Sequence, residues 1–480
     1  MVMNIKDMVI PAPAKVSEEH GIACNLPKLN WIESEGDFAF AAGIVNDAFA
    51  HVGLPRLPYN PFKMNLGTRQ RVSLRIESSL KPEAYRLGIG NETITIAGGD
   101  RAGVLHGART LAQIIAVSSD LGGHDRLIPV GLVEDAPRFA YRGVMLDSSR
   151  HFQSAETIVK LLDEMSKYKL NRFHWHLVDR QGWRLPLDCA PELTRDMPKS
   201  RCYNFGAYTK DDIAAIRHAA AEREITIIPE IEMPGHSAAV FMTHPELACD
   251  TGADPFANDF WEFCLGNPAS KTFLTKVLEE VCALFPDSPV IHIGGDEAST
   301  AHWEKCPRCR ATLQKRGFTS MRELEQDFMR EMEGVVKALG RRAMTWGLTS
   351  DFGAHFSPDM TIQNWLREDL SGYAGGGRPV VNSFHKACYI DYPVGDDAPV
   401  ADWQKKTYAF DMAGGLPKKQ ADVVIGGEGC IWTEQIPEWR TLPRAVPRLR
   451  ALAETLWTPA ALKDFANFQL RERRLVGSGL

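Results

Sequence analysis

The sequence of 480 residues predicts an α/β fold, a (β/α)8 TIM barrel preceded by a smaller α+β domain. Three observations lead to this prediction. The chain is too long for one small domain. Eight short apolar runs alternate with helical segments from Arg142 onward. Residue types that carry chemistry follow these runs, and this is where a barrel places its active site.

The N-terminal part of the chain mixes strand-like and helix-like segments. The runs RQRVSLRIES and TITIAGGD are typical of strands, whereas AGVLHGARTLAQIIAV has apolar residues at helical spacing. The stretch VEDAPRFAYRG, which contains a proline, then separates this part from the regular repeats. We therefore expect an accessory domain over residues 1–137 and the barrel over residues 138–480.

The barrel strands are expected at eight apolar runs. In chain order they are RGVMLD, NRFHWHLVD, ITIIPEIE, PVIHIGGDE, RAMTWG, TIQNWL, PVVNSF and DVVIGGEGCIW. Capping patterns begin two of the helices between them, with Thr209 three residues before Asp212 and Ser320 three residues before Glu323. A doubly wound open sheet is the alternative, but no GxGxxG or Walker loop follows any of the runs.

Composition and charge limit the kinds of binding partner and the cellular location that we expect for the protein. The hydrophobic fraction of 44% and charged fraction of 24% are those of a globular protein. A net charge of −6 without basic runs argues against nucleic acid and anionic membranes as partners. The sequence has neither a signal-peptide core nor an apolar run of about 18 residues. We expect a cytoplasmic monomer or homodimer, or a periplasmic or secreted protein if a leader was removed.

Ten cysteines are scattered through the chain and are expected to be buried free thiols. Cys306 and Cys309 form one CxxC pair. A structural zinc ion needs a second ligand pair, and none is found at a suitable spacing. No metal and no cofactor is therefore expected.

Candidate functional residues stand at or just after the ends of the predicted strands. In chain order they are Asp147, Arg150, His176, Asp179, Glu232, His236, Asp296, Glu297, Trp346, Trp365, Tyr389, Asp391, Trp432 and Glu434. The three tryptophans would form flat apolar walls suited to a sugar ring and a methyl group, although each could instead be core at the barrel mouth.

Asp296 and Glu297 are adjacent, and this adjacency restricts the chemistry. Two neighbouring strand residues reach one ligand only where the backbone turns, and Gly294 and Gly295 permit such a turn. A glycosidase usually places an acid and a nucleophile or base on opposite sides of the bond, about 5 to 10 Å apart. Adjacent residues meet this requirement poorly, so the nucleophile could come from the substrate.

The motif HIGGDE at residues 292–297 resembles the catalytic signature of glycoside hydrolase family 20, the β-N-acetylhexosaminidases. The resemblance extends over the whole predicted barrel, through RGVMLDSSRHF, NRFHWHLVDRQGWR, PEIEMPGH, TWG, YID and GGEGCIWTE. The leading domain is similar to the accessory domain of that family. Glu232 departs from the family pattern, which often has Asp there, and is left out of the expected site.

The resemblance implies hydrolysis with retention, in which the 2-acetamido oxygen attacks C1 and forms an oxazolinium intermediate. Glu297 would be the general acid and base, Asp296 would bind the acetamido N–H, and Tyr389 would hold its oxygen. By the same resemblance Trp346, Trp365 and Trp432 form the pocket, and Arg150, Asp391 and Glu434 bind hydroxyls. Asp179 and His236 would tune the pKa of Glu297 toward the working pH, or would only join two loops.

The implied partner is an oligosaccharide or glycoconjugate that ends in N-acetylglucosamine or N-acetylgalactosamine, as in chitin fragments. Two other functions are kept as alternatives. A metal-dependent barrel hydrolase could use His174, His176, His236 and Asp179 as ligands. A non-catalytic carbohydrate-binding protein could share the scaffold, but binding alone needs no acid.

Overall fold

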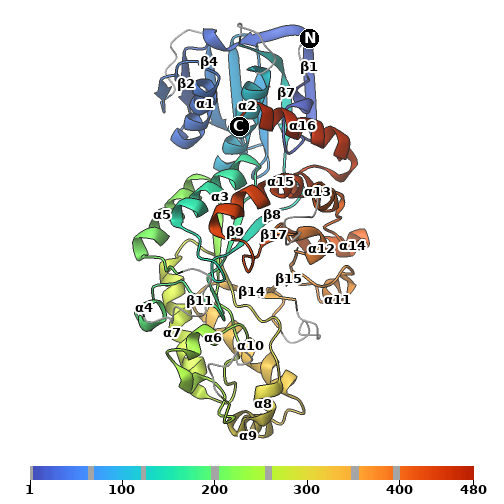
Figure 1. The fold of residues 1–480 in the computed structure, drawn as a ribbon. Helices are drawn as coiled ribbons and strands as arrows, with labels where there is room; N and C mark the ends of the chain where they lie inside the picture. Colours follow the sequence, from blue (N-terminus) through green and yellow to red (C-terminus); the bar gives the residue numbers. More distant parts are fainter. Residues whose placement is uncertain are drawn as a thin grey trace.

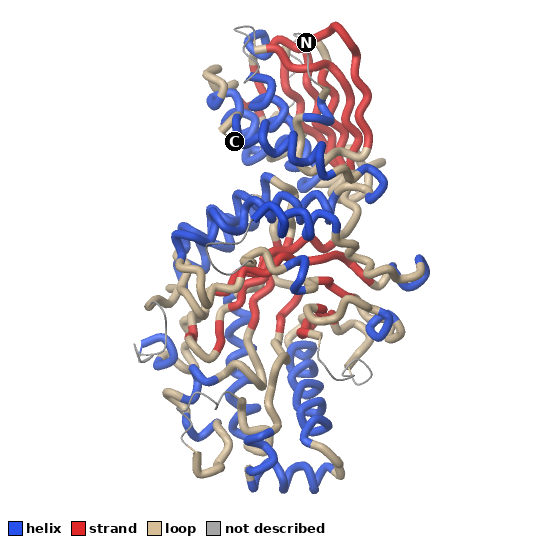
Figure 2. Tube along the Cα trace, turned by 45° about the vertical axis from the view of Figure 1, so that its right-hand side comes forward, coloured by secondary structure: helices blue, strands red, loops and turns tan. Residues whose placement is uncertain are grey.

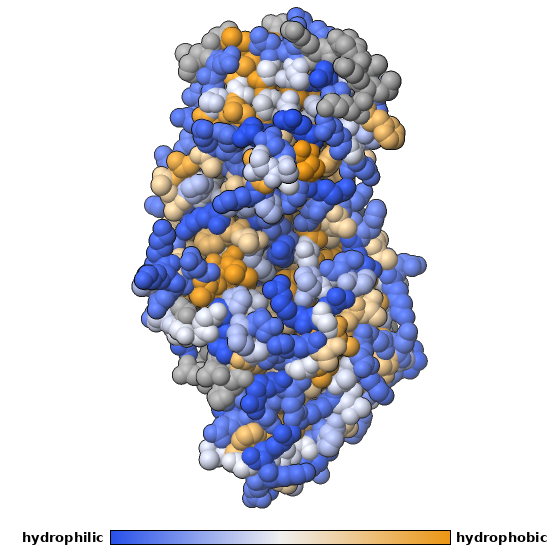
Figure 3. Space-filling model, turned by 180° about the vertical axis from the view of Figure 1, so that it is seen from behind, coloured by the Kyte–Doolittle hydropathy of each residue, from blue (hydrophilic) through white to orange (hydrophobic). Residues whose placement is uncertain are grey.

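The computed structural model describes residues 4–62, 70–119, 126–195, 205–253, 262–347, 356–392 and 400–479. It has an N-terminal domain at one end and a barrel below it (Figure 1). Among the described residues no helix is long and apolar enough to cross a membrane. Seen from behind, the surface is mainly hydrophilic, and its apolar atoms form several separate groups (Figure 3).

A mixed sheet of seven strands forms the first domain, in the order β1-β7-β5-β6-β4-β2-β3. Its strands are β1 (Lys15–Asn25), β2 (Trp31–Ser34), β3 (Tyr59–Asn60), β4 (Arg71–Ile76), β5 (Tyr85–Ile89), β6 (Thr93–Gly98) and β7 (Leu127–Asp135). The helices α1 (Ala39–His51) and α2 (Arg101–Ser119) pack together, and α2 contacts the sheet. The predicted α+β character of this part is confirmed.

Eight parallel strands close into a barrel, as predicted. They are β8 (Tyr141–Asp147), β9 (Arg172–His176), β12 (Thr226–Glu230), β13 (Val290–His292), β14 (Arg342–Trp346), β15 (Thr361–Asn364), β16 (Val380–Asn382) and β17 (Val424–Ile431). Strand β17 pairs with β8 and closes the ring. Seven of the strands lie within the predicted runs, and β8 begins one residue before its run. Figure 2 shows these strands at the centre, with helices around them.

Helices follow the barrel strands and pack outside them. The longer ones are α3 (Ala155–Lys167), α5 (Lys210–Glu222), α7 (Pro268–Leu284), α9 (Pro307–Arg316), α10 (Met321–Ala338), α13 (Val400–Ala409), α15 (Glu438–Trp457) and α16 (Phe465–Gly477). The shorter ones are α4 (Glu192–Arg195), α6 (Ala238–Phe241), α8 (Ala301–Lys305), α11 (Ser371–Ala374), α12 (His385–Cys388) and α14 (Lys418–Ala421). Both predicted caps are present, because the Thr209 side chain accepts from the Asp212 N–H and Ser320 from the Glu323 N–H.

The two domains are joined by buried polar contacts. Arg142, at the start of β8, donates to both carboxylate oxygens of Glu83 at 2.6 and 3.0 Å. Helix α16 returns from the barrel and packs against α2 (Figure 1). The boundary at residues 137 and 138 stays a prediction, and the C-terminal helix that it assigns to the barrel contacts both domains.

One sequence expectation is wrong. The pair Cys306 and Cys309 does have a second pair, because the sulfurs of Cys249 and Cys264 lie beside it, and all four sulfur atoms are within 4.8 Å of one another. Loops that are 42 to 60 residues apart in sequence bring these cysteines together. A search for closely spaced ligand pairs therefore cannot find them.

Candidate active site

A cavity of about 410 Å³ opens at the carboxyl ends of the barrel strands. Ten of the eleven residues expected in the site line it: Arg150, Asp179, His236, Asp296, Glu297, Trp365, Tyr389, Asp391, Trp432 and Glu434. Glu232, Tyr392, Gln435 and Ile436 also line it, and none of these four was among the expected site residues. The site therefore draws on loops and strands from the whole length of the barrel sequence.

The turn after β13 places Asp296 and Glu297 in this cavity. Gly294 and Gly295 have φ angles of +63° and +107°, in a region that favours glycine. A Cβ atom on Gly294 would lie 1.9 Å from Glu232 Oε2, so a larger residue there would displace the Glu232 side chain. The Thr345 hydroxyl donates to the Gly294 carbonyl at 2.6 Å and holds the turn against β14. The turn therefore lets both neighbouring carboxylates reach one cavity.

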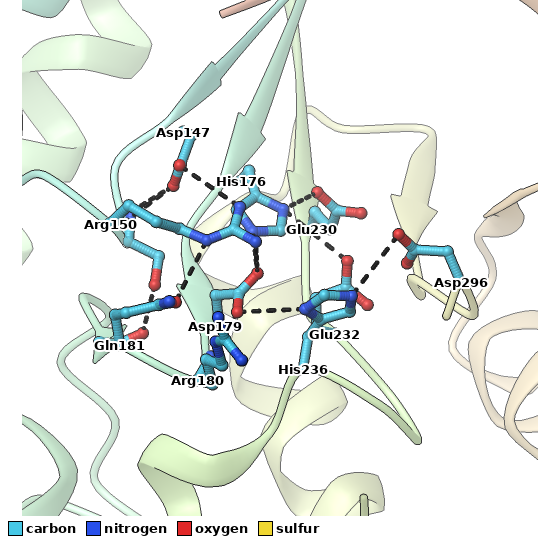
Figure 4. A network of polar contacts seen from close by, with 12 residues as sticks. Asp147, Arg150, His176, Asp179, Arg180, Gln181, Glu230, Glu232, His236 and Asp296 are labelled. Carbon is cyan, nitrogen blue, oxygen red and sulfur yellow. Dashed lines mark hydrogen bonds and ion pairs between the residues drawn. The ribbon is translucent and has the colours of Figure 1, made fainter. Parts of the chain in front are cut away.

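Asp179 is the centre of a charged network at the cavity wall (Figure 4). Its Oδ2 lies 2.7 Å from Arg150 Nη2 and 3.0 Å from His176 Nε2, and its Oδ1 lies 3.2 Å from His236 Nδ1. Although burial opposes ionisation, the charges of Arg150 and His236 hold the pKa of Asp179 well below its usual range. Asp179 is thus a permanent anion that orients two cations.

His236 carries this network to the acidic pair. Its Nε2 lies 3.7 Å from Asp296 Oδ2 and 3.5 Å from Glu297 Oε2. Although burial opposes it, the negative charges of Asp179 and Asp296 hold the pKa of His236 well above its usual range. His236 is therefore a cation shared by both carboxylates.

The two carboxylates respond differently to their surroundings. Burial raises the pKa of Asp296 to about 6, and His236 opposes this rise. A hydrogen bond from His236 lowers the pKa of Glu297, whose side chain is 52% exposed. The expected shift toward the working pH is therefore not seen at Glu297, because its histidine neighbour is positively charged and the exposed carboxylate stays hydrated.

Aromatic side chains form one side of the cavity. The Trp432 ring lies 6.0 Å from the Tyr389 ring, and the Arg150 guanidinium stacks over Trp432 at 4.9 Å. The indole of Trp365 is fixed by a 3.0 Å bond from its N–H to the Gly347 carbonyl. These flat walls suit the C–H face of a sugar.

Trp346 lies beneath the cavity and does not line it. It is 1% exposed, packs against Trp432 at 5.9 Å, and donates its indole N–H to Glu230 Oε1 at 2.6 Å. Glu230 also contacts His174, His176 and His292, so it ties four strands together below the site. Glu230 was not predicted, although its place at the end of an apolar run is a signal for an inward-facing carboxylate.

Glu232 was left out of the expected site, but it lines the cavity. Its side chain is buried, and Oε2 has no hydrogen-bond partner among the described residues. Burial and the nearby charge of Asp296 raise its pKa well above the usual range. Glu230 and Glu232 alternate along the chain and so face the same side, which could have indicated its position.

Asp391 and Glu434 occupy the remaining wall. Burial raises the pKa of Asp391 to about 8, and its Oδ1 has no partner within the described part of the chain. Glu434 is partly exposed and lies 3.8 Å from Arg150. Both carboxyls are therefore available to sugar hydroxyls.

The residues that the metal-hydrolase alternative would use as ligands do not form one metal site. His174 lies between Glu230 at 3.1 Å and Glu428 at 2.8 Å, and both of its nitrogens are engaged. His176 lies between Glu230 and Asp179. Among the described residues, no group close enough to hold a metal combines His174 and His176 with His236.

Two family models match the chain. The model of the glycosyl hydrolase family 20 catalytic domain matches residues 139–460, and that of domain 2 of the same family matches residues 6–136. The chain belongs to glycosyl hydrolase family 20. The predicted family and fold class are thereby confirmed.

Two related proteins are similar to most of this chain. A beta-hexosaminidase of Porphyromonas gingivalis is 33% identical over 424 residues, which cover 81% of this chain and 52% of that protein. One of Akkermansia muciniphila is 32% identical over 424 residues, covering 84% of this chain and 85% of that protein. The chain thus spans about half the length of the first relative and most of the second.

A solved family 20 structure matches the whole chain. The exo beta-N-acetylglucosaminidase of Vibrio harveyi, in complex with N-acetylglucosamine, has a TM-score of 0.87 at 28% identity and covers 100% of this chain and 78% of that chain. The predicted enzyme class, a glycoside hydrolase of the β-hexosaminidase type, is confirmed by these relatives.

Proposed function

We propose that this family 20 enzyme removes a terminal, non-reducing N-acetylhexosamine, with Glu297 as the only enzymatic acid and the acetamido group as nucleophile. One observation carries the assignment of roles. An oxygen of Asp296, an oxygen of Glu297 and a nitrogen of His236 lie within 4.8 Å of one another. Two carboxylates that both face one imidazole are poorly placed to stand on opposite sides of a glycosidic bond.

In the first step, the acetamido oxygen forms a bond to C1 while the bond from C1 to the leaving oxygen breaks. Glu297 transfers its proton to that oxygen. Asp296 accepts a hydrogen bond from the acetamido N–H, and its negative charge stabilises the developing oxazolinium cation. In the second step, Glu297 removes a proton from the water that attacks C1, and the bond from C1 to the acetamido oxygen breaks. The acetamido group stays on C2, and the sugar leaves with retained configuration at C1.

Binding is assigned to the rest of the cavity. Tyr389 holds the acetamido oxygen, and Trp365 and Trp432 cover the sugar faces. Arg150, Asp391 and Glu434 bind hydroxyls through charge-assisted hydrogen bonds. A cavity of about 410 Å³ fits one sugar residue better than a long chain, which supports release of single residues from the end of an oligosaccharide or glycoconjugate.

A matched pair of aryl β-glycosides tests this function. The 2-acetamido glycoside is expected to be cleaved, and the 2-hydroxy glucoside with the same leaving group to be slower by a factor on the order of 10⁵ or more, because it lacks the internal nucleophile. Comparing the gluco and galacto forms of the acetamido substrate then gives the preference at C4. Similar rates for the acetamido and hydroxy substrates would overturn substrate assistance.

A further inference from the structure

Four buried cysteines lie together outside the active site. Cys249 follows the first turn after α6, Cys264 precedes α7, and Cys306 and Cys309 flank the start of α9. Figure 1 shows α6 to α9 in the part of the barrel farthest from the N-terminal domain. The hexosaminidase mechanism uses none of these thiols.

Three of the six distances between the sulfur atoms match the edges of a tetrahedron around one zinc ion, and the other three are within 4.8 Å. The Sγ atoms of Cys249 and Cys309 are 3.7 Å apart, those of Cys264 and Cys306 are 3.8 Å apart, and those of Cys264 and Cys309 are 3.6 Å apart. Four sulfurs around one zinc ion at 2.3 Å are separated by about 3.8 Å. A disulfide needs about 2.05 Å, so the thiols are not paired in this arrangement.

The surroundings bring the cysteine-bearing loops close together. All four cysteine side chains are buried. A Cβ on Gly266 would lie 2.3 Å from the backbone carbon of Arg308, so glycine permits this close approach. Four cysteine sulfurs packed together in a buried site form a ligand set for one divalent cation that accepts sulfur. When the cysteines are deprotonated, that cation balances the charge of the thiolates.

We propose that Cys249, Cys264, Cys306 and Cys309 bind one structural zinc ion. With all four positions filled by sulfur, the ion keeps no open position for substrate, so its role is structural. The site lies in two long loops of the barrel, one between β12 and α7 and the other between β13 and α10.

The zinc site would clamp the two loops that begin at the catalytic residues. The first loop contains His236 and the second contains Asp296 and Glu297. Besides the cysteines, the loops are joined where Ser299 N–H donates to Glu262 at 2.9 Å and the Trp303 indole to the Phe263 carbonyl at 2.9 Å. Metal binding therefore stabilises the relative position of His236 and the acidic pair.

The purified full-length chain, prepared without added metal, gives the first test. Elemental analysis is expected to find about one zinc per chain, and titration with a mercurial reagent should release it as the cluster thiols react. A chain with no bound metal, with iron in place of zinc, or with these cysteines joined as disulfides in peptide mapping would overturn the proposal. This readout does not depend on activity, so it separates the zinc site from the proposed function.

Paired variants give the second test. The double variant Cys306→Ser and Cys309→Ser should lose its zinc and lower the melting temperature by about 5 °C or more. The control double variant Cys24→Ser and Cys282→Ser changes two thiols outside the cluster and should keep the zinc. Zinc retained by the cluster variant, or lost from the control alone, would contradict the assignment. If the cluster variant does not fold, release of zinc from the unmodified chain decides.

Discussion

At the residue scale, the pKa values of Asp296 and Glu297 stand in the opposite order to the one that the proposed reaction needs. Burial raises the pKa of Asp296 to about 6, and His236 lowers that of Glu297. The proposed mechanism requires an ionised Asp296 and a protonated Glu297. In this mechanism a bound substrate would correct both, because its N–H would stabilise the Asp296 anion and its second sugar would cover the exposed face of Glu297. Substrate binding and acid activation are thus coupled.

The charge on His236 predicts a pH effect. Since Asp296 must be ionised, kcat/KM should fall as the pH drops through about 6. In His236→Asn the cation that favours ionised Asp296 is lost, so the pKa of Asp296 rises and the acid limb moves up by about one pH unit. The exposed His218 on α5 provides the control variant His218→Asn, which should leave the profile unchanged. A limb that stays in place in His236→Asn would contradict this account.

The role of Glu297 predicts a dependence on the leaving group. In Glu297→Gln, kcat/KM should fall by about 10² to 10⁴ for a poor leaving group and far less for an activated phenol, which departs without a proton. Asp296→Asn should impair both substrates alike, since the acetamido group participates whatever the leaving group. Steady-state kinetics on a series of aryl glycosides measures both. Equal losses across the series in Glu297→Gln would show that Glu297 is not the leaving-group acid.

The sequence predicted the residues that line the cavity better than the residues that lie beneath it. Ten of the eleven expected residues line the cavity, because each follows a strand that apolar patterning locates. Trp346 lies one layer lower, since its indole is drawn to the buried Glu230. Glu232 was not predicted because it stands where the family often has an aspartate. Its position two residues after Glu230 indicates that both side chains face the same side.

At the element scale, the strands were predictable and the long loops were not. The run PVIHIGGDE forecasts a buried strand and a turn, and β13 ends at His292 with the glycines immediately after Ile293. The cysteine cluster depends instead on how the loops after β12 and β13 fold against each other. The cysteines that contact each other between these loops are 42 to 60 positions apart in the sequence. Local periodicity cannot predict such contacts.

At the scale of the whole molecule, the barrel is fixed to the first domain from two sides. Arg142 reaches Glu83 across the junction, and α16 crosses back to α2. In Figure 1 the first domain and α16 lie together above the barrel. Arg142 lies at the start of β8, whereas the cavity lies at the carboxyl ends of the barrel strands. Among the described residues, those that line the cavity all belong to the barrel sequence, so the first domain supports the barrel from outside the site.

The central claim is that the substrate supplies the nucleophile at a site with one enzymatic acid. The most direct measurement is kcat/KM for aryl glycosides whose acetamido methyl carries zero, one, two or three fluorines, with the leaving group unchanged. Fluorine withdraws electrons from the acyl oxygen, so the account predicts a stepwise fall in kcat/KM with each fluorine. A rate that does not change across the series would contradict it.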